Sequence, residues 1–117
     1  MFTFDPALDA QVPPERMQGL YARAHEWYRV NAPQIADGGA QLQSVETATT
    51  VKNSPSGTVV VDGPFSEAKE VIGGFSIIDV PNLDAAIKLV RTWPFLELPS
   101  WGVEIRPILT VGRKSEG

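Results

Sequence analysis

The chain contains no cysteine and only one histidine, His25, among its 117 residues. The missing thiol excludes thiolate catalysis, disulfides, iron–sulfur clusters and every zinc site built on sulfur. Because the familiar sulfur-free zinc sites use two or three imidazoles, a single histidine argues against zinc within one chain. Carboxylates alone remain as ligands, for a hard cation such as Mg²⁺. We predict neither a metal nor a cofactor.

Long apolar runs and an excess of basic charge are also missing. No segment approaches the ~20 apolar residues that would cross a bilayer, and Met1–Asp5 lacks the basic and apolar regions of a secretory signal. We therefore expect a soluble, cytoplasmic protein with no membrane partner. The net charge of −4 and the isoelectric point near 4.9 oppose the neutralisation of phosphates. No direct contact with nucleic acid is expected.

The remaining composition is that of one globular domain over residues 1–117, with 43% apolar and 21% charged residues. Met1–Asp5 alternates as a short strand does. A helix is predicted from Pro14, with a break near Asn31–Ala32 because Pro33 lacks an amide, and with its end at Gly38–Gly39. Its apolar stripe has helical spacing: Met17, Leu20, Tyr21, Ala24, Trp27, Tyr28 and Ile35.

Four further elements follow in the sequence. Leu42–Lys52 and Thr58–Val61 are β-branched runs separated by the turn cluster Asn53–Gly57, which predicts a hairpin with a five-residue loop. The other three are a strand at Gly74–Val80, a helix that Asn82 caps and Pro94 ends, and a last strand at Val103–Val111. Pro107 indicates that this last strand lies at a sheet edge or contains a bulge.

This order predicts an α+β fold: a ferredoxin-like βαββαβ plan with an extra β-hairpin and an antiparallel sheet. In the strand that includes Phe75 and Ile77, both alternating faces are apolar, because Ile78 and Val80 occupy the other one. A second copy of the chain would cover the extra face, so a homodimer is predicted. The alternative is that the hairpin or the Leu96–Trp101 loop folds over that face.

The most distinctive segment runs from Asp62 to Phe75. Gly63-Pro64 ends a strand, Asp62 can accept hydrogen bonds from nearby amides, and the residues up to Glu70 can form one helical turn. Asp-Gly-Pro-Phe, the Glu-x-Lys-Glu cluster and Gly-Gly-aromatic together resemble the DGPF domain of the YCII-related family, and the resemblance extends over about residues 38–108.

The resemblance implies a dimeric α/β barrel, in which two sheets face one another across a cleft. Relatives are mostly uncharacterised; some look like enzymes, and some occur alongside transcription sigma factors. A typical relative pairs a histidine on the first helix with an aspartate just before a Pro-aromatic dipeptide. Here Trp93 precedes Pro94-Phe95, and the family's histidine position falls nearer Trp27 or Tyr28 than His25. The dyad is not carried over.

Four residues are candidates for chemistry. Asp62 and Glu67 belong to a charged cluster with Lys69 and Glu70. This cluster could bind a cation or tune the pKa of one carboxylate, or simply be a capped turn with solvated charges. Arg106 could hold an anionic ligand, or form an ion pair with Glu104 or with one of the turn acids. His25 could act as an acid or base, or be a solvated residue beside the core stripe.

Candidate ligand-binding residues are the aromatic side chains and the charges of the distinctive segment: Phe65, Lys69, Glu70, Phe75, Trp27 and Tyr28. Together with other aromatics they are numerous enough to line an apolar pocket, although aromatics at this spacing usually belong to the core. Three functions remain open: binding or transformation of a small organic molecule in a dimer cleft, a sigma-factor-associated regulatory module acting through protein contacts, or a structural domain without catalysis. The sequence leaves open whether the protein is an enzyme.

Overall fold

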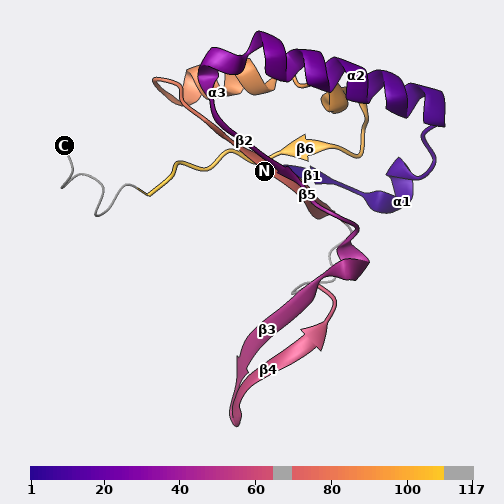
Figure 1. The fold of residues 1–117 in the computed structure, drawn as a ribbon, viewed down its shortest axis with the longest axis vertical. Coiled ribbons are helices and arrows are strands. Elements are labelled where there is room, and N and C mark those ends of the chain that lie inside the picture. The colour runs from indigo at the N-terminus through magenta and orange to yellow at the C-terminus, as the bar shows by residue number, and fades with distance from the viewer. Residues whose placement is uncertain (65–69, 110–117) are drawn as a thin grey trace.

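The computed structural model describes residues 1–64 and 70–109, which form an α+β fold with antiparallel sheets. Four strands pair in the order β2–β5–β1–β6, and both longer helices lie on one side of this sheet (Figure 1). That order is compatible with the predicted ferredoxin-like plan. The elements are β1 Phe2–Phe4, α1 Pro6–Asp9, α2 Pro14–Val30, β2 Ile35–Gln41, β3 Thr49–Ser54, β4 Gly57–Asp62, β5 Val71–Ile78, α3 Leu83–Val90 and β6 Gly102–Val103.

Helix α2 begins at Pro14 and ends at Val30, so the predicted start and the break at Asn31–Ala32 are confirmed. The Asn31 side chain donates to the Trp27 carbonyl at 2.9 Å and holds the last turn. The prediction that helix continues to Gly38–Gly39 was wrong, because a short 3₁₀ turn leads into β2. Pairing with β5 satisfies the backbone of this segment better than a helix interrupted by proline would.

Strands β3 and β4 form a hairpin that is tighter than predicted, since Ser54 and Gly57 already pair with one another. Gly57 has a φ of 118°, which only glycine adopts without strain. Leu42–Ala48 is not part of this hairpin. It follows the end of β2 and includes a 3₁₀ turn. The helical turn expected around Glu67 lies outside the described residues.

The second half of the chain agrees with the sequence except at its end. Strand β5 begins three residues earlier than predicted, at Val71, and Asn82 caps α3 by accepting from the Ala85 amide at 2.9 Å. The last strand was predicted too long: of the residues described up to Leu109, Gly102–Val103 joins the sheet, and the amide of Glu104 adds a bond to the Met1 carbonyl. Pro107 has no amide with which to extend this edge pairing.

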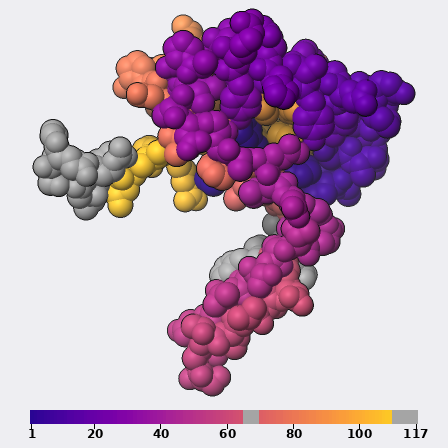
Figure 2. All heavy atoms as spheres, in the orientation of Figure 1, coloured from indigo at the N-terminus to yellow at the C-terminus, as the bar shows by residue number. Residues whose placement is uncertain are grey.

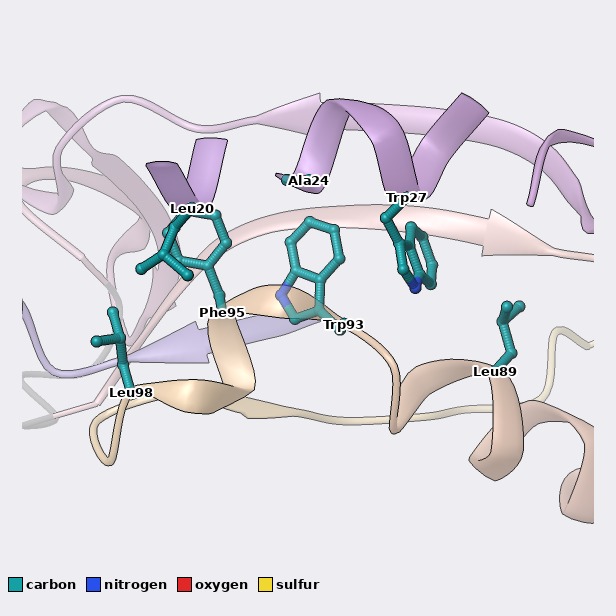
Figure 3. Packing of buried hydrophobic residues seen from close by; sticks show 7 residues of the cluster. All are labelled: Leu20, Ala24, Trp27, Leu89, Trp93, Phe95 and Leu98. Atoms are coloured by element: carbon teal, nitrogen blue, oxygen red, sulfur yellow. The ribbon is translucent and has the colours of Figure 1, made fainter. Parts of the chain in front are cut away.

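The core lies between the helices and the sheet (Figure 3). Leu20 of α2 is fully buried, and burial of such a side chain contributes about 1.5–3 kcal/mol. Trp93 and Phe95 enter this layer from the loop after α3, so residues that are far apart in sequence meet there. The buried cluster consists of Leu20, Ala24, Trp27, Leu89, Trp93, Phe95 and Leu98.

The opposite face of β5 is apolar and open. Ser76 bonds to α2 and Ile78 packs against the core, so the alternation of the strand directs Phe75 and Ile77 to the other face. Phe75 is 41% exposed and Ile72 is 49% exposed. The Leu96–Trp101 loop packs against the core instead of this face, and the hairpin projects as a separate arm (Figure 2).

Candidate functional site

A cavity of about 610 Å³ lies between α2 and the sheet, and we call it the α2–sheet pocket. Helix α2, β1 and the loop after α3 supply the aromatic side chains of its wall, and β2 and β5 form the floor. The aromatic wall contains Phe2, Phe4, Tyr21, Tyr28, Trp93, Phe95 and Trp101. None of the helices in the described residues is long and apolar enough to span a bilayer.

The floor of the pocket depends on glycines, which let neighbouring strands approach closely. A Cβ on Gly73 would come within 2.5 Å of the Phe4 ring, and one on Gly74 would come within 2.7 Å of the Ala40 carbonyl oxygen. Gly39 has a φ of 70°, and its Cβ would be 1.7 Å from the Phe75 carbonyl oxygen. Strands β2 and β5 therefore approach as bare backbone. The Gly-Gly pair of the distinctive segment serves this approach.

The aromatic wall is continuous. The ring centroids of Tyr28 and Trp93 lie 5.7 Å apart, those of Trp93 and Phe95 also lie 5.7 Å apart, and Trp101 follows 4.5 Å beyond Phe95. Phe4 stacks on the far side of Trp101 at 5.2 Å. Because such contacts between rings stabilise beyond simple burial, the wall is a rigid surface.

The three indole N–H groups of the chain differ in their partners. Trp27 Nε1 donates to Thr92 Oγ1 at 2.7 Å, and Trp101 Nε1 donates to Asp9 Oδ1 at 2.9 Å. Trp93 Nε1 is buried without a partner, in a residue only 7% exposed. A buried donor left unpaired costs about 1–3 kcal/mol. The pocket wall therefore contains an unsatisfied donor.

Polar groups meet the pocket at two further points. Ser76 Oγ donates its one proton to the Gly38 carbonyl at 2.8 Å, so Tyr28 must be the donor in its 2.6 Å bond to Ser76. This leaves the Tyr28 hydroxyl free to accept. Nearby, Gln41 Nε2 donates to the Tyr21 hydroxyl at 3.3 Å.

An ion-pair clamp holds the aromatic loop against α2. Glu97 accepts from Arg16 and Arg23, both at 3.0 Å. These bonds, from Arg23 first and Arg16 second, lower the pKa of the Glu97 carboxyl from its ordinary value of 4.5. The clamp is exposed, so its free-energy contribution is small and screened by salt.

The structure divides the sequence-predicted residues among several places. His25 and Tyr28 line the α2–sheet pocket, with His25 exposed at its rim. Trp27, Phe75 and Arg106 line a second cavity of about 660 Å³ beside α3. The Arg106 guanidinium donates to Glu104 at 2.6 Å, which is the ion pair weighed from the sequence.

The turn residues lie apart from both cavities. Asp62 is exposed at the base of the hairpin, and its carboxylate accepts no hydrogen bond from a described amide; the amides of the turn after Pro64, to which its capping bond was predicted, lie outside the described residues. Instead the Gly63 amide donates to the Ala48 carbonyl and Thr50 Oγ1 donates to the Gly63 carbonyl, both at 2.7 Å. Glu70 is exposed. Phe65, Glu67 and Lys69 lie outside the described residues.

Sequence reasoning missed Asp9, Tyr21 and Gln41 as pocket residues, and counted Trp93 among the aromatics that could either line an apolar pocket or belong to the core. Asp9 shows no motif, because it ends the four-residue helix α1; it lines the pocket itself and accepts a hydrogen bond from Trp101 there. For Trp93 a signal existed, since it directly precedes Pro94-Phe95. Among the described residues, no three histidine, aspartate or glutamate side chains gather as metal ligands.

Comparison with known proteins identifies the domain. The family model of the YCII-related domain matches residues 28–111. The chain belongs to the YCII-related family. An uncharacterized protein of Rhizobium meliloti (strain 1021) is 36% identical over 69 residues, which cover 59% of this chain and 56% of that protein. The matched part thus spans little more than half of this relative.

The family match divides the pocket of this YCII-related domain. Tyr28, the glycine floor and the aromatic loop with Trp93 lie within the matched residues. Asp9, Tyr21 and His25 precede them. The floor and the aromatic wall therefore come mostly from the family part of the chain, whereas the ionisable side chains Asp9 and His25 come from the segment before it.

Proposed function

We propose that this YCII-related domain binds a small organic molecule in the α2–sheet pocket. The observation that carries the proposal is the pocket itself, because a volume of about 610 Å³ falls within the range of small-molecule sites, about 300–1,000 Å³, and its lining combines apolar rings with a few polar groups. The polar side chains of the lining include Tyr21, Tyr28, His25, Asp9 and Gln41.

The unpaired Trp93 N–H supports the same proposal. Its nitrogen is closed to bulk water and has no acceptor, so a ligand that brings an oxygen to it would recover the lost hydrogen bond. A ligand with one carbonyl, ether or hydroxyl oxygen and an apolar body matches such a wall. The fixed aromatic stack lowers the entropy that binding must overcome.

His25 is the lining side chain best suited to move a proton. Imidazole exchanges protons near neutral pH, and His25 is exposed at the rim where ligand and solvent meet. Acid–base chemistry on the bound molecule would therefore use His25. Loss of turnover with intact binding in His25→Ala would separate this role from binding.

A thermal-shift screen of small metabolites tests the binding function, because a ligand that binds only the folded state raises the unfolding temperature. The matched variants are Gly38→Leu and Gly19→Leu. Around both glycines the position of a Cβ is open, but only Gly38 lines the pocket. Hits that stabilise the natural chain and Gly19→Leu but not Gly38→Leu support the proposal. A screen without hits, or hits indifferent to Gly38→Leu, contradicts it.

We also infer that the chain is one domain, a ferredoxin-like fold with an added hairpin, that pairs with a second copy as a dimeric α/β barrel. The open face with Phe75 and Ile72 supports this, since a sheet face with exposed apolar side chains gains by burial. The hairpin adds exposed Val51 and Val60, at 63% and 69%. Two-stranded hairpins are marginal alone, so a partner would stabilise the arm. Binding of a regulatory protein is the competing outcome.

A further inference from the structure

The described residues that line the α2–sheet pocket include a carboxylate but no lysine or arginine. Among these described residues the ionisable side chains are Asp9, His25, Tyr21 and Tyr28. At neutral pH the one group here with a permanent charge is the Asp9 carboxylate. An anionic ligand would meet no lysine or arginine among these described residues and would be repelled by the Asp9 carboxylate.

Asp9 is placed so that its charge acts on the pocket. It is half-buried, Trp101 Nε1 donates to its Oδ1 at 2.9 Å, and its backbone carbonyl accepts from Val12 at 3.1 Å. No described lysine or arginine forms an ion pair with it. The carboxylate is therefore oriented by one neutral donor and retains unused acceptor capacity.

The surroundings of Asp9 strengthen the attraction between its carboxylate and a cation. Trp101 lies between Phe4 and Phe95, with ring centroids 5.2 and 4.5 Å away, so the carboxylate borders an apolar wall rather than open water. Electrostatic attraction is stronger where the local dielectric is low. Aromatic rings also attract cations wherever they present a face. The chain's net charge of −4 draws cations from a distance.

We propose that the pocket selects organic cations: a primary or substituted amine on an apolar, ring-sized body with an oxygen acceptor at its other end. This rests on the proposed binding function. The ammonium group pairs with Asp9, and the oxygen acceptor reaches Trp93. Asp9 is bonded to Trp101, and along the wall the Phe95 ring contacts both Trp101 and Trp93. A ligand that reaches from Asp9 to Trp93 therefore needs a body about one aromatic ring long.

Three probes with the same ring and the same methoxy acceptor test the charge preference: para-anisylamine, para-anisyl alcohol and para-anisate. Affinity is measured by calorimetry on the full chain, and the indole N–H resonances are followed in proton–nitrogen correlation spectra. The amine is expected to bind on the order of tenfold more tightly than the alcohol, and the anisate most weakly. The Trp101 signal, whose proton faces Asp9, should shift most with the amine.

Asp9→Asn supplies the decisive variant because it removes the charge but keeps an oxygen for Trp101. It should erase the difference between amine and alcohol, whereas Asp84→Asn, which changes the net charge equally on an exposed site outside the pocket lining, should preserve it. Equal or reversed preference in the natural chain overturns the selectivity while binding itself upholds the pocket function. Failure of all three probes to bind contradicts both.

Discussion

Trp27 and Trp93 meet edge to face in the core, with ring centroids 5.1 Å apart and planes inclined at 78°, yet only one of the two indoles is satisfied. Trp27 donates to Thr92, whose hydroxyl in turn donates to the Leu89 carbonyl at 2.6 Å. Trp93 has no acceptor. Two similar side chains in one cluster thus have different tasks: Trp27 ties α2 to the end of α3, and Trp93 forms the wall of a pocket.

This contrast predicts that replacing each tryptophan by phenylalanine lowers the free energy of unfolding by a different amount. Trp27→Phe loses a hydrogen bond as well as volume, whereas Trp93→Phe loses volume but also removes a buried, unpaired donor. In the absence of ligand, Trp27→Phe should reduce the free energy of unfolding by about 1 kcal/mol more than Trp93→Phe. Urea denaturation measures both. Equal losses would mean that the Trp93 N–H is satisfied in solution.

The bond between Tyr28 and Ser76 should couple α2 to β5. Tyr28→Phe and Ser76→Ala each remove it, and a double-mutant cycle should give a coupling free energy of about 0.5–1.5 kcal/mol. Chemical denaturation of the natural chain, both single variants and the double variant completes the cycle. Additive losses would show that the 2.6 Å contact contributes nothing to stability.

At the hairpin base, Thr50 and not Asp62 should matter. Thr50→Val keeps the β-branched shape but removes the bond to the Gly63 carbonyl, so the hairpin amides should open more easily by about 1 kcal/mol. Asp62→Ala should leave their protection unchanged, since no described amide bonds to its carboxylate. Amide hydrogen exchange measures the protection of the individual hairpin amides. The reverse ranking would restore the capping role expected from the sequence.

The Glu97 clamp predicts a specific pH dependence. Because Arg23 and Arg16 lower the pKa of this carboxyl in the folded state, its contribution is present above the unfolded pKa and is lost as pH falls through the folded one. Glu97→Gln should therefore unfold at a lower temperature than the natural chain near neutral pH. This gap should close well below pH 4.5 and shrink in high salt. A gap that persists in acid would point to packing rather than charge.

The open face of β5 predicts the behaviour of Phe75→Lys. If a second copy covers this face, the charge should convert a dimer to a monomer at micromolar concentration, as measured by sedimentation equilibrium. Val30→Lys is the matched control, because Val30 is 59% exposed on α2, on the other side of the sheet. A natural chain that is already monomeric would exclude the dimer, and capture by a heterologous protein would favour the regulatory alternative.

The sequence alone determined the local elements whose signals lie within a few residues. The 3.6-residue apolar stripe places α2, and the missing amide of Pro33 ends it near Asn31–Ala32. The side chain of Asn82 begins α3, and turn residues mark the hairpin. The distinctive segment around Gly63-Pro64 also indicated the family, and the alternation around Phe75 indicated an apolar second face.

Only the tertiary structure decided where these elements meet. Residues 35–41 became a strand because β5 offers an antiparallel partner, which no local pattern reveals. The pocket joins Asp9, Tyr21 and Trp101 across almost the whole chain, and its floor exists because β2 and β5 approach without side chains. Contacts between distant segments depend on the packing of the entire core. A short window of sequence records the preference of each residue but not the partner that satisfies it.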